Sequence, residues 1–504
     1  MNMHTMSKRK ITLIVVAAAL IVAAVVSAPY LVREAAKLPF FRYLRLESLA
    51  DVIAERQIYW EEGDDPMLIA YQSYFETDEE VSHGEIRKAF LDLIGEDSEC
   101  YYTLANLMLS HYDQYSKLVS QEVYQQIYPE NENYGGLGMI VSAYEPFIRV
   151  VDVYEDSAAD IAGVLPGDRI AVVNGMDIRP LAYEEASGLL AEVSANGGTV
   201  GIVREGETQL LTLKLTPEEV VIPNVDWQVD GDVAYLRITL FSGNDFNDLV
   251  DKAFADFREA GATRLVLDMR DNRGGTIKLL VHLLDALTAE KDVLLFTEIK
   301  RDQVVEHYST GIGMSFEDVV VLANENTCSS AEVCTGYMKD RGYPVVGTLT
   351  YGKGTGLSIL DFYGDVLVIA TIDIILPKTG SYNGIGIEPT IEVSDLYVPV
   401  ELPELQPLDS SVLIDATSDT ADIKALEERL ALLGYLFSVP DGIWDAETAE
   451  AVNAVAELAD SDGASPETLA LIEEMIERYA NARYYVDAQL ETAYEWIGAA
   501  ELAA

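Results

Sequence analysis

The chain has 504 residues, and 49% of them are hydrophobic, which is enough for about three domains with sizeable cores and excludes a disordered protein. It carries 34 Lys and Arg against 85 Asp and Glu, a net charge of −51. This balance argues against nucleic acid and anionic lipid headgroups as partners, because their phosphates attract basic surfaces.

The N-terminus predicts a membrane segment. Basic residues 8–10 precede a run of 22 residues without charge, "ITLIVVAAALIVAAVVSAPYLV". A helix of that length spans a bilayer, and the basic flank keeps its N-terminal side in the cytoplasm. We therefore expect residues 1–33 to be a cytoplasmic tail and a single-pass anchor in the cell membrane, with the rest extracytoplasmic. The alternative is a signal-peptidase site at Val26-Ser27-Ala28, which would release a secreted protein.

Periodicity divides the chain into further units, which together predict a multidomain α/β protein. Residues 36–130 repeat apolar positions at helical spacing, and 134–220 alternate short β-type runs with two helices. Residues 225–400 alternate buried strands and helices. A Pro- and Glu-rich linker follows over 401–415, then a small helical unit over 416–480 and a final helix over 481–504.

The stretch "NENTCSSAEVC" places hydroxyl groups where a strand ends and a helix begins. Ser329 and Ser330 follow the apolar run "DVVVLAN", at the sheet edge where α/β proteins place their sites. Free N–H groups at a helix N-terminus suit a developing oxyanion, although such residues can equally be a simple N-cap. None of the five histidines has a setting that favours it as the base, and no G-x-S-x-G elbow is present.

Two Gly-rich segments supply candidate partners. "TYGKGTG" places Lys353 after the strand "YPVVG" and 24 residues beyond Ser329, a crossover length that brings both to one sheet edge. A lysine acts as a base only when burial lowers its pKa. "LVLDMRDNRGG" ends a buried strand in a turn where Gly274 or Gly275 can donate to an oxyanion together with the Ser330 amide.

The order and spacing of these segments resemble the C-terminal processing peptidases, also called tail-specific proteases. "LDMRDNRGG", "NENTCSSAE" and "GTLTYGKG" match three motifs of that family. The resemblance covers roughly residues 40–400 and implies a Ser–Lys serine endopeptidase in which Ser329 is the nucleophile and Lys353 the base. It further implies that Gly274 and Ser330 bind the oxyanion, without a metal or organic cofactor.

The resemblance also implies a PDZ domain over residues 134–220. "YGGLGMIV" is similar to a carboxylate-binding loop, and "DSAADIAGVLPGDRIAVVNGMDI" to the middle of a PDZ domain. A substrate with a free C-terminus would add a strand to the sheet edge, its carboxylate held by the N–H groups of Gly135, Gly136, Leu137 and Gly138. Protein or peptide substrates are therefore the expected partners.

One residue departs from the family pattern. The family carries a Gln four residues after the lysine, where this chain has Leu357. Leucine accepts no hydrogen bond, so the lysine must be oriented by another group, or activity is lost. The alternative function is thus a weak or inactive scaffold that binds protein C-termini. Cys328 as nucleophile is disfavoured by its register in the motif.

The C-terminal unit resembles a peptidoglycan-binding domain. "LEERLALLGY", "DGIWDAETAEAV" and "DGASPETLALI" carry the similarity, although "VA" replaces the usual "FQ" of the second helix. The expected roles are peptidoglycan binding or, in a degenerate copy, packing or dimerisation. The final helix, "VDAQLETAYEWI", is amphipathic and suited to pairing with a second subunit as a homodimer.

Overall fold

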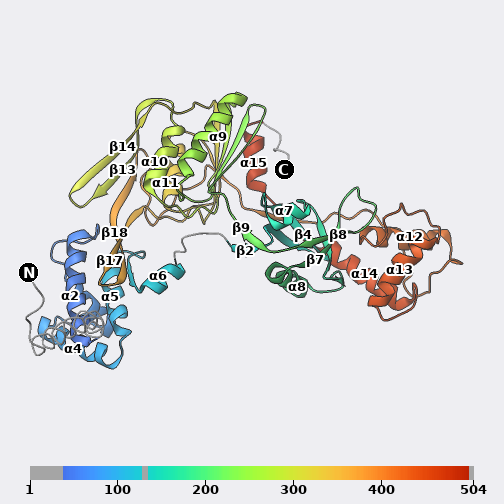
Figure 1. Cartoon of the computed structure of the whole chain (residues 1–504), viewed down its shortest axis with the longest axis horizontal. Helices are drawn as coiled ribbons and strands as arrows, with labels where there is room; N and C mark the ends of the chain where they lie inside the picture. Colours follow the sequence, from blue (N-terminus) through green and yellow to red (C-terminus); the bar gives the residue numbers. More distant parts are fainter. Residues whose placement is uncertain (1–37, 128–133, 499–504) are drawn as a thin grey trace, which may run out of the picture.

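The computed structural model describes residues 38–127 and 134–498, which form helical units around β-rich and α/β parts (Figure 1). The predicted anchor over residues 1–33 lies outside the described residues. Within the described residues, no helix combines the length and the apolar character that crossing a bilayer requires.

The N-terminal unit is a small bundle of helices that packs against a β-hairpin. Its helices and the strand and helix that follow are α2 (Pro39–Arg56), α3 (Pro66–Phe75), α4 (His83–Glu96), α5 (Cys100–Ser110), β1 (Lys117–Val119) and α6 (Gln121–Ile127). Asp65 caps α3, and Ser82 with Glu85 forms a capping box on α4. The buried core of the bundle continues into Leu367 and Ile369 of a distant strand. The bundle and the strand therefore share one core.

Residues 134–220 form a second β-rich unit. Five strands lie in the order β3-β4-β5-β7-β8, so β3 is an edge strand, and β2 pairs with β9 outside this sheet. The elements are β2 (Tyr134–Gly136), β3 (Met139–Tyr144), β4 (Phe147–Val153), α7 (Ala158–Ala162), β5 (Arg169–Val173), β6 (Met176–Asp177), α8 (Tyr183–Asn196), β7 (Gly198–Val203), β8 (Leu211–Leu215) and β9 (Glu218–Val220).

The central α/β part is a six-stranded sheet covered by helices on both faces. Its strands run in the order β10-β11-β12-β15-β16-β20, and all neighbours except β10 and β11 are parallel. The elements are β10 (Val225–Asp230), β11 (Val233–Ile238), α9 (Phe246–Ala260), β12 (Arg264–Asp268), α10 (Ile277–Ala286), β15 (Asp318–Ala323), α11 (Ser330–Asp340), β16 (Val345–Gly347) and β20 (Ile391–Glu392).

Alternate residues of the central strands face opposite helical layers. Leu265 and Val321 pack with α9, α10 and α11, whereas Val266 and Val320 pack on the other face with the last helix of the chain. Parallel strands buried on both faces read as continuous apolar runs, which is why "RLVLD" and "DVVVLA" show no alternation.

The strands predicted over residues 225–400 do not all belong to the central sheet. Several of them form a second sheet. β13 (Lys291–Lys300), β14 (Gln303–Thr310), β17 (Thr355–Phe362), β18 (Asp365–Leu376) and β19 (Gly380–Ser381) form it together with β1. β18 pairs with β1, β13 and β17. Because β1 belongs to the N-terminal unit, β18 joins that unit to the central part. The pairings of β18 with β1 and β13 join segments far apart in the chain, so local sequence patterns could not reveal them.

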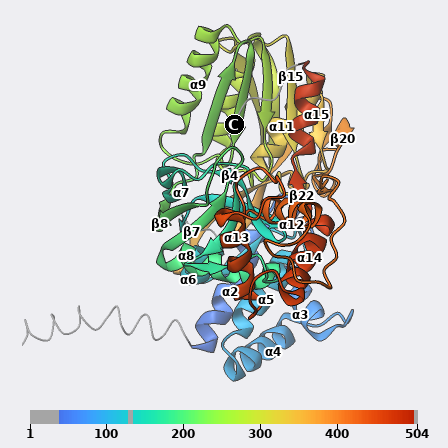
Figure 2. The same ribbon diagram turned by 90° about the vertical axis from the view of Figure 1, so that its right-hand side faces the viewer.

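The C-terminal region leaves the central part and returns to it. β21 (Leu396–Pro399) leads out and β22 (Arg483–Val486) leads back as its antiparallel partner. Between them lie α12 (Thr420–Leu432), α13 (Ala446–Leu458) and α14 (Pro466–Asn481), and α15 (Ala488–Trp496) follows. Figures 1 and 2 show α15 beside the central sheet and the three other helices beside the β-rich unit.

The final helix corrects two expectations. Residues 483–486 are a strand and not the start of the helix expected over 481–504. The apolar face of α15, with Ala493 and Tyr494, is buried against the central sheet of its own chain. That face is therefore not available to a second subunit, because the sheet of the same chain already removes it from water.

Candidate active site

Ser329 stands where β15 passes into α11, and its backbone is held in an unusual conformation. The φ angle of Ser329 is 59° and its ψ angle is −120°. Residues other than glycine rarely adopt positive φ, and the cost is tolerated where neighbouring contacts enforce it. Two such contacts precede the serine: Thr327 Oγ1 donates to the carbonyl of Met269 at 2.9 Å, and the Cys328 amide donates to the carbonyl of Asn272 at 2.8 Å.

Glu332 joins the serine loop to the lysine loop. Its fully buried carboxylate accepts hydrogen bonds from the Ser329 amide at 2.8 Å and the Lys353 amide at 2.7 Å. It also accepts from the Gly352 amide and from Thr350 Oγ1, both at 2.6 Å. Burial raises the pKa of Glu332, and these hydrogen bonds oppose that shift. One side chain thus fixes the backbone of both predicted catalytic residues.

Glu332 lies within the motif "NENTCSSAE", but the motif alone does not indicate its role. The available signal was its position three residues after Ser329 at a helix start, where a glutamate can bond back to the N-cap amide. Its two bonds to Gly352 and Lys353 come from a loop about 20 residues away and could not be inferred from local spacing.

Lys353 lies in a half-buried position with a perturbed amine. Burial is the main cause that lowers its pKa, and the positive charge of Lys117 acts in the same direction. The flanking glycines permit the close packing, since a Cβ on Gly354 would lie 2.9 Å from the Asn383 amide nitrogen. Lys353 Nζ lies 5.3 Å from the ring centre of Tyr115. A lysine in this setting loses its proton more readily than one in water.

The structure brings Gly274 directly beside the predicted nucleophile. A Cβ on Gly274 would lie 2.6 Å from Ser329 Cβ and 3.0 Å from the Ser330 nitrogen, so only glycine fits. The amide of Gly274 donates to Asn272 Oδ1 at 2.8 Å. Among the described residues, no acceptor is recorded for the Ser330 amide. Of the two predicted oxyanion donors, the Ser330 N–H therefore remains available among the described residues, whereas the Gly274 N–H already donates to Asn272 Oδ1.

The predicted proton-transfer pair, Ser329 and Lys353, lies on two loops that share the carboxylate of Glu332. No hydrogen bond joins the Ser329 hydroxyl and Lys353 Nζ in the part of the chain that the structure describes. Catalytic hydrogen bonds are often long in substrate-free enzymes and tighten when substrate binds. Burial raises the pKa of the neighbouring Cys328 to about 12, with the charge of Glu332 acting in the same direction. The Cys328 thiol is therefore a poor source of thiolate.

The four residues predicted to bind a substrate carboxylate lie in the β-rich unit. Gly135 and Gly136 belong to β2 and pair with Glu219 and Glu218 of β9. Leu137 is buried, and Gly138 has a φ of 74° with its carbonyl bonded to Ser157 Oγ. No recorded hydrogen bond joins these four described residues to Ser329 or Lys353. The structure therefore groups them with each other and not with the nucleophile.

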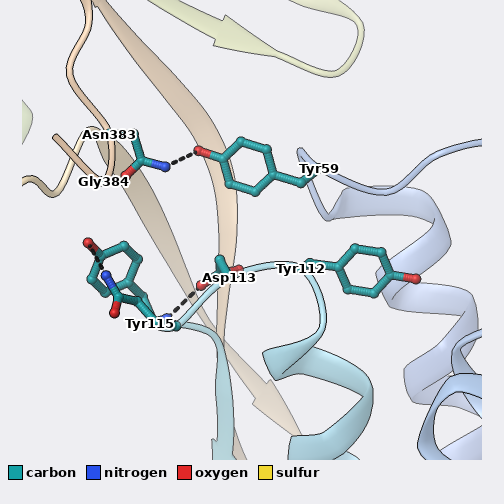
Figure 3. A pocket seen from close by; sticks show the side chains of 7 residues that line it. Tyr59, Tyr112, Asp113, Tyr115, Asn383 and Gly384 are labelled. Carbon is teal, nitrogen blue, oxygen red and sulfur yellow. Dashed lines mark hydrogen bonds between the residues drawn. The ribbon is translucent and has the colours of Figure 1, made fainter. Parts of the chain in front are cut away.

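A cavity of about 380 Å³ opens between the N-terminal unit and the loop that holds Asn383 and Gly384 (Figure 3). Tyr59 and Asn383 lie on one side, where Asn383 Nδ2 donates to the Tyr59 hydroxyl at 3.0 Å. Asp113 and Tyr115 lie on the other side, on the loop before β1. Within the described ranges, no three His, Cys, Asp or Glu side chains are grouped as metal ligands would be.

The chain is similar to known proteases over its central part. Residues 232–393 match Peptidase family S41. The Carboxy-terminal-processing protease of Bartonella bacilliformis is 28% identical over 320 residues, which cover 62% of this chain and 72% of that protein. The Carboxyl-terminal-processing protease of Picosynechococcus sp. is 28% identical over 369 residues, or 69% of this chain and 86% of that protein. The S41 match spans the central sheet together with Ser329 and Lys353, and these relatives match more than half of the chain, so the chain is similar to serine-type peptidases of the carboxyl-terminal-processing kind.

Proposed function

We propose that this peptidase is a membrane-anchored, extracytoplasmic endopeptidase that cuts proteins near their C-termini with a Ser329–Lys353 dyad. The observation that carries the proposal is the carboxylate of Glu332, which accepts hydrogen bonds from the backbone amides of both residues. A structural N-cap alone would need the bond to Ser329 but not the bonds to the distant lysine loop. The shared carboxylate supports a preorganised pair.

The proposed reaction begins with neutral Lys353. Ser329 Oγ attacks the scissile carbonyl carbon, and its proton passes to Lys353 Nζ. The negative charge that develops on the carbonyl oxygen is held by the Ser330 N–H, joined by the Gly274 N–H when it turns from Asn272. The ammonium then returns the proton to the leaving amine, which departs as the C–N bond breaks. Lys353 Nζ then takes a proton from water, which attacks the acyl carbonyl carbon; the bond from that carbon to Ser329 Oγ breaks, and the ammonium returns the proton to Ser329 Oγ.

The β-rich unit is proposed to act as a PDZ domain that selects substrate tails. The edge position of β3 in its sheet supports this role, because an exposed edge can accept a peptide as an added strand. Gly135, Gly136, Leu137 and Gly138 would supply the amides that hold the terminal carboxylate. Residues 1–33 would anchor the enzyme, and the unit over 416–480 would bind peptidoglycan in the cell wall.

A serine-reactive fluorophosphonate probe tests the dyad without knowledge of the natural substrate. We expect the full-length protein in detergent to be labelled on Ser329, as located by peptide mass spectrometry. The Lys353→Ala variant should lose the labelling, because the hydroxyl then lacks its base. Absence of labelling in a folded wild-type protein would instead support the scaffold function, which the replacement of the family's glutamine by Leu357 favours.

The lowered pKa of Lys353 also predicts the pH dependence of turnover. The base must be neutral, so kcat/KM should rise as pH increases through the pKa of Lys353 and level off above it. Because burial lowers this pKa, the rise should occur below the ordinary lysine range of about 10.4. A profile of kcat/KM from pH 5 to about 11, which includes the ordinary lysine pKa, measures the position of the limb. A limb at the ordinary lysine pKa would show that Lys353 is solvated and contradict the proposed role.

A further inference from the structure

The loop over residues 111–116 reaches from the N-terminal unit to the active-site lysine and is held rigidly. Asp113 Oδ1 accepts from the amides of Tyr115 at 2.7 Å and Ser116 at 2.6 Å. Asp113 Oδ2 accepts from Nε2 of the fully buried Gln57 at 2.7 Å. A carboxylate with these partners fixes the loop to α2 and to itself. Tyr115 is therefore presented in a defined position.

Tyr115 contacts the lysine loop in two ways. Its ring centre lies 5.3 Å from Lys353 Nζ, within the range of a cation–π interaction. Its hydroxyl donates to the carbonyl of Gly352 at 3.3 Å and accepts from Gln114 Nε2 at 2.9 Å. On the other side of the lysine, the Gly354 amide donates to Asn383 Oδ1 at 3.1 Å, next to the cavity in Figure 3. The lysine backbone is thus held on both flanks.

Among the residues that the structure describes, none gives the amine of Lys353 a polar partner. Within the described residues, Lys353 Nζ makes no hydrogen bond and has no carboxylate within salt-bridge distance. Its one cation–π contact among these residues is with the ring of Tyr115. The charged and titratable groups that influence it are Cys328, Lys117, Glu332 and Asp113. Leu357, at the place where related peptidases carry an orienting glutamine, accepts no hydrogen bond.

We propose that Tyr115 positions Lys353 for proton transfer, and that its ring face does the work of the glutamine that Leu357 replaces. This inference rests on the proposed Ser–Lys function. When Ser329 Oγ attacks, its proton moves to Lys353 Nζ and creates an ammonium. The negative face of the aromatic ring attracts that ammonium and its bulk keeps water away. The N-terminal unit would therefore complete the active site of the central part.

Substitutions at Tyr115 separate the ring from its hydroxyl. We expect Tyr115→Leu, which keeps apolar volume but removes the ring, to lower kcat about three- to thirtyfold with KM unchanged. Tyr115→Phe keeps the ring and should stay close to wild type. The control is Tyr363→Leu, which removes an exposed tyrosine ring that lies 5.2 Å from Arg45, at the opposite end of β17 from the lysine loop. A wild-type kcat in Tyr115→Leu, or an equal loss in Tyr115→Phe, would overturn the proposal.

A second measurement tests the ring–amine contact without turnover. In a Ser329→Ala background, acetylation of Lys353 by acetic anhydride is followed against pH by peptide mass spectrometry. Removal of the ring destabilises the ammonium, so the midpoint for Tyr115→Leu should lie at lower pH than that for Tyr115→Phe. Equal midpoints would refute the contact. Because this result does not depend on cleavage, it distinguishes a failure of the tyrosine inference from a failure of the proposed function.

Discussion

Alanine in place of Ser329 is expected to reduce casein cleavage by the full-length enzyme at least about a thousandfold, and alanine in place of Lys353 by a similar factor. The two losses should be alike, because a nucleophile and its base act as a unit and either removal leaves only binding and oxyanion stabilisation. Gel and mass-spectrometric analysis of the casein products measures the loss. Thermal unfolding of each variant verifies that the fold is retained.

Two further variants make this result specific. Cys328→Ala changes the residue next to the nucleophile and should retain activity, because the thiol is held protonated by burial. Loss of activity in Cys328→Ala with retention in Ser329→Ala would show that the motif is out of register. Leu357→Gln should raise kcat if the family's glutamine still fits this site. Cleavage by Leu357→Gln alone, with an inert wild type, would identify a scaffold derived from a protease.

Replacing Glu332 by alanine is expected to cost both stability and activity. The substitution leaves three backbone amides and one hydroxyl without their acceptor in a buried place. Each buried donor that loses its acceptor typically costs about 1–3 kcal/mol, so we expect the free energy of unfolding to fall by at least about 3 kcal/mol. Because the same carboxylate sets the distance between the serine and lysine loops, we also expect kcat to fall by about a hundredfold.

The matched control for Glu332 is another glutamate of the same loop. Glu325 accepts a single hydrogen bond from Thr348 Oγ1 at 2.8 Å on the surface, so Glu325→Ala should change stability by less than about 1 kcal/mol. Urea unfolding gives the two free energies, and active-site titration with the fluorophosphonate separates lost activity from lost fold. A Glu332→Ala enzyme that is fully active at low temperature would show that the carboxylate serves stability alone.

The outcome at the final helix shows where periodicity is insufficient. The amphipathic pattern of residues 486–497 indicated an apolar face but not the surface that buries it. That surface is the central sheet, and the contact is reinforced by Asp487, which caps α15 and binds Arg270 Nη1 at 2.5 Å. Arg270 also pairs with the fully buried Asp268. An apolar helix face does not specify which surface it packs against, because hydrophobic burial is not directional.

Leu357 and Tyr115 show the same limit inside the site. The missing glutamine is visible in the sequence, since Leu357 stands four residues after the lysine. The group that faces the lysine in its place comes from 238 residues upstream and carries no motif. The pairing of β1 with β18 brings that loop beside the lysine loop, and the amide of Ala370 in β18 donates to Ser116 Oγ at 2.9 Å.

By itself, the sequence predicted which residues form the candidate site and determined their order along the chain. Ser329, Lys353 and Gly274 follow buried strands in Gly-rich or hydroxyl-rich turns, and local rules of strand ends and helix starts suffice to find them. The tertiary structure alone decided what holds them: Glu332 across two loops, Tyr115 from the N-terminal unit and α15 behind the sheet. These contacts join residues far apart in sequence, and their free energy depends on burial and distance, which local pattern does not encode.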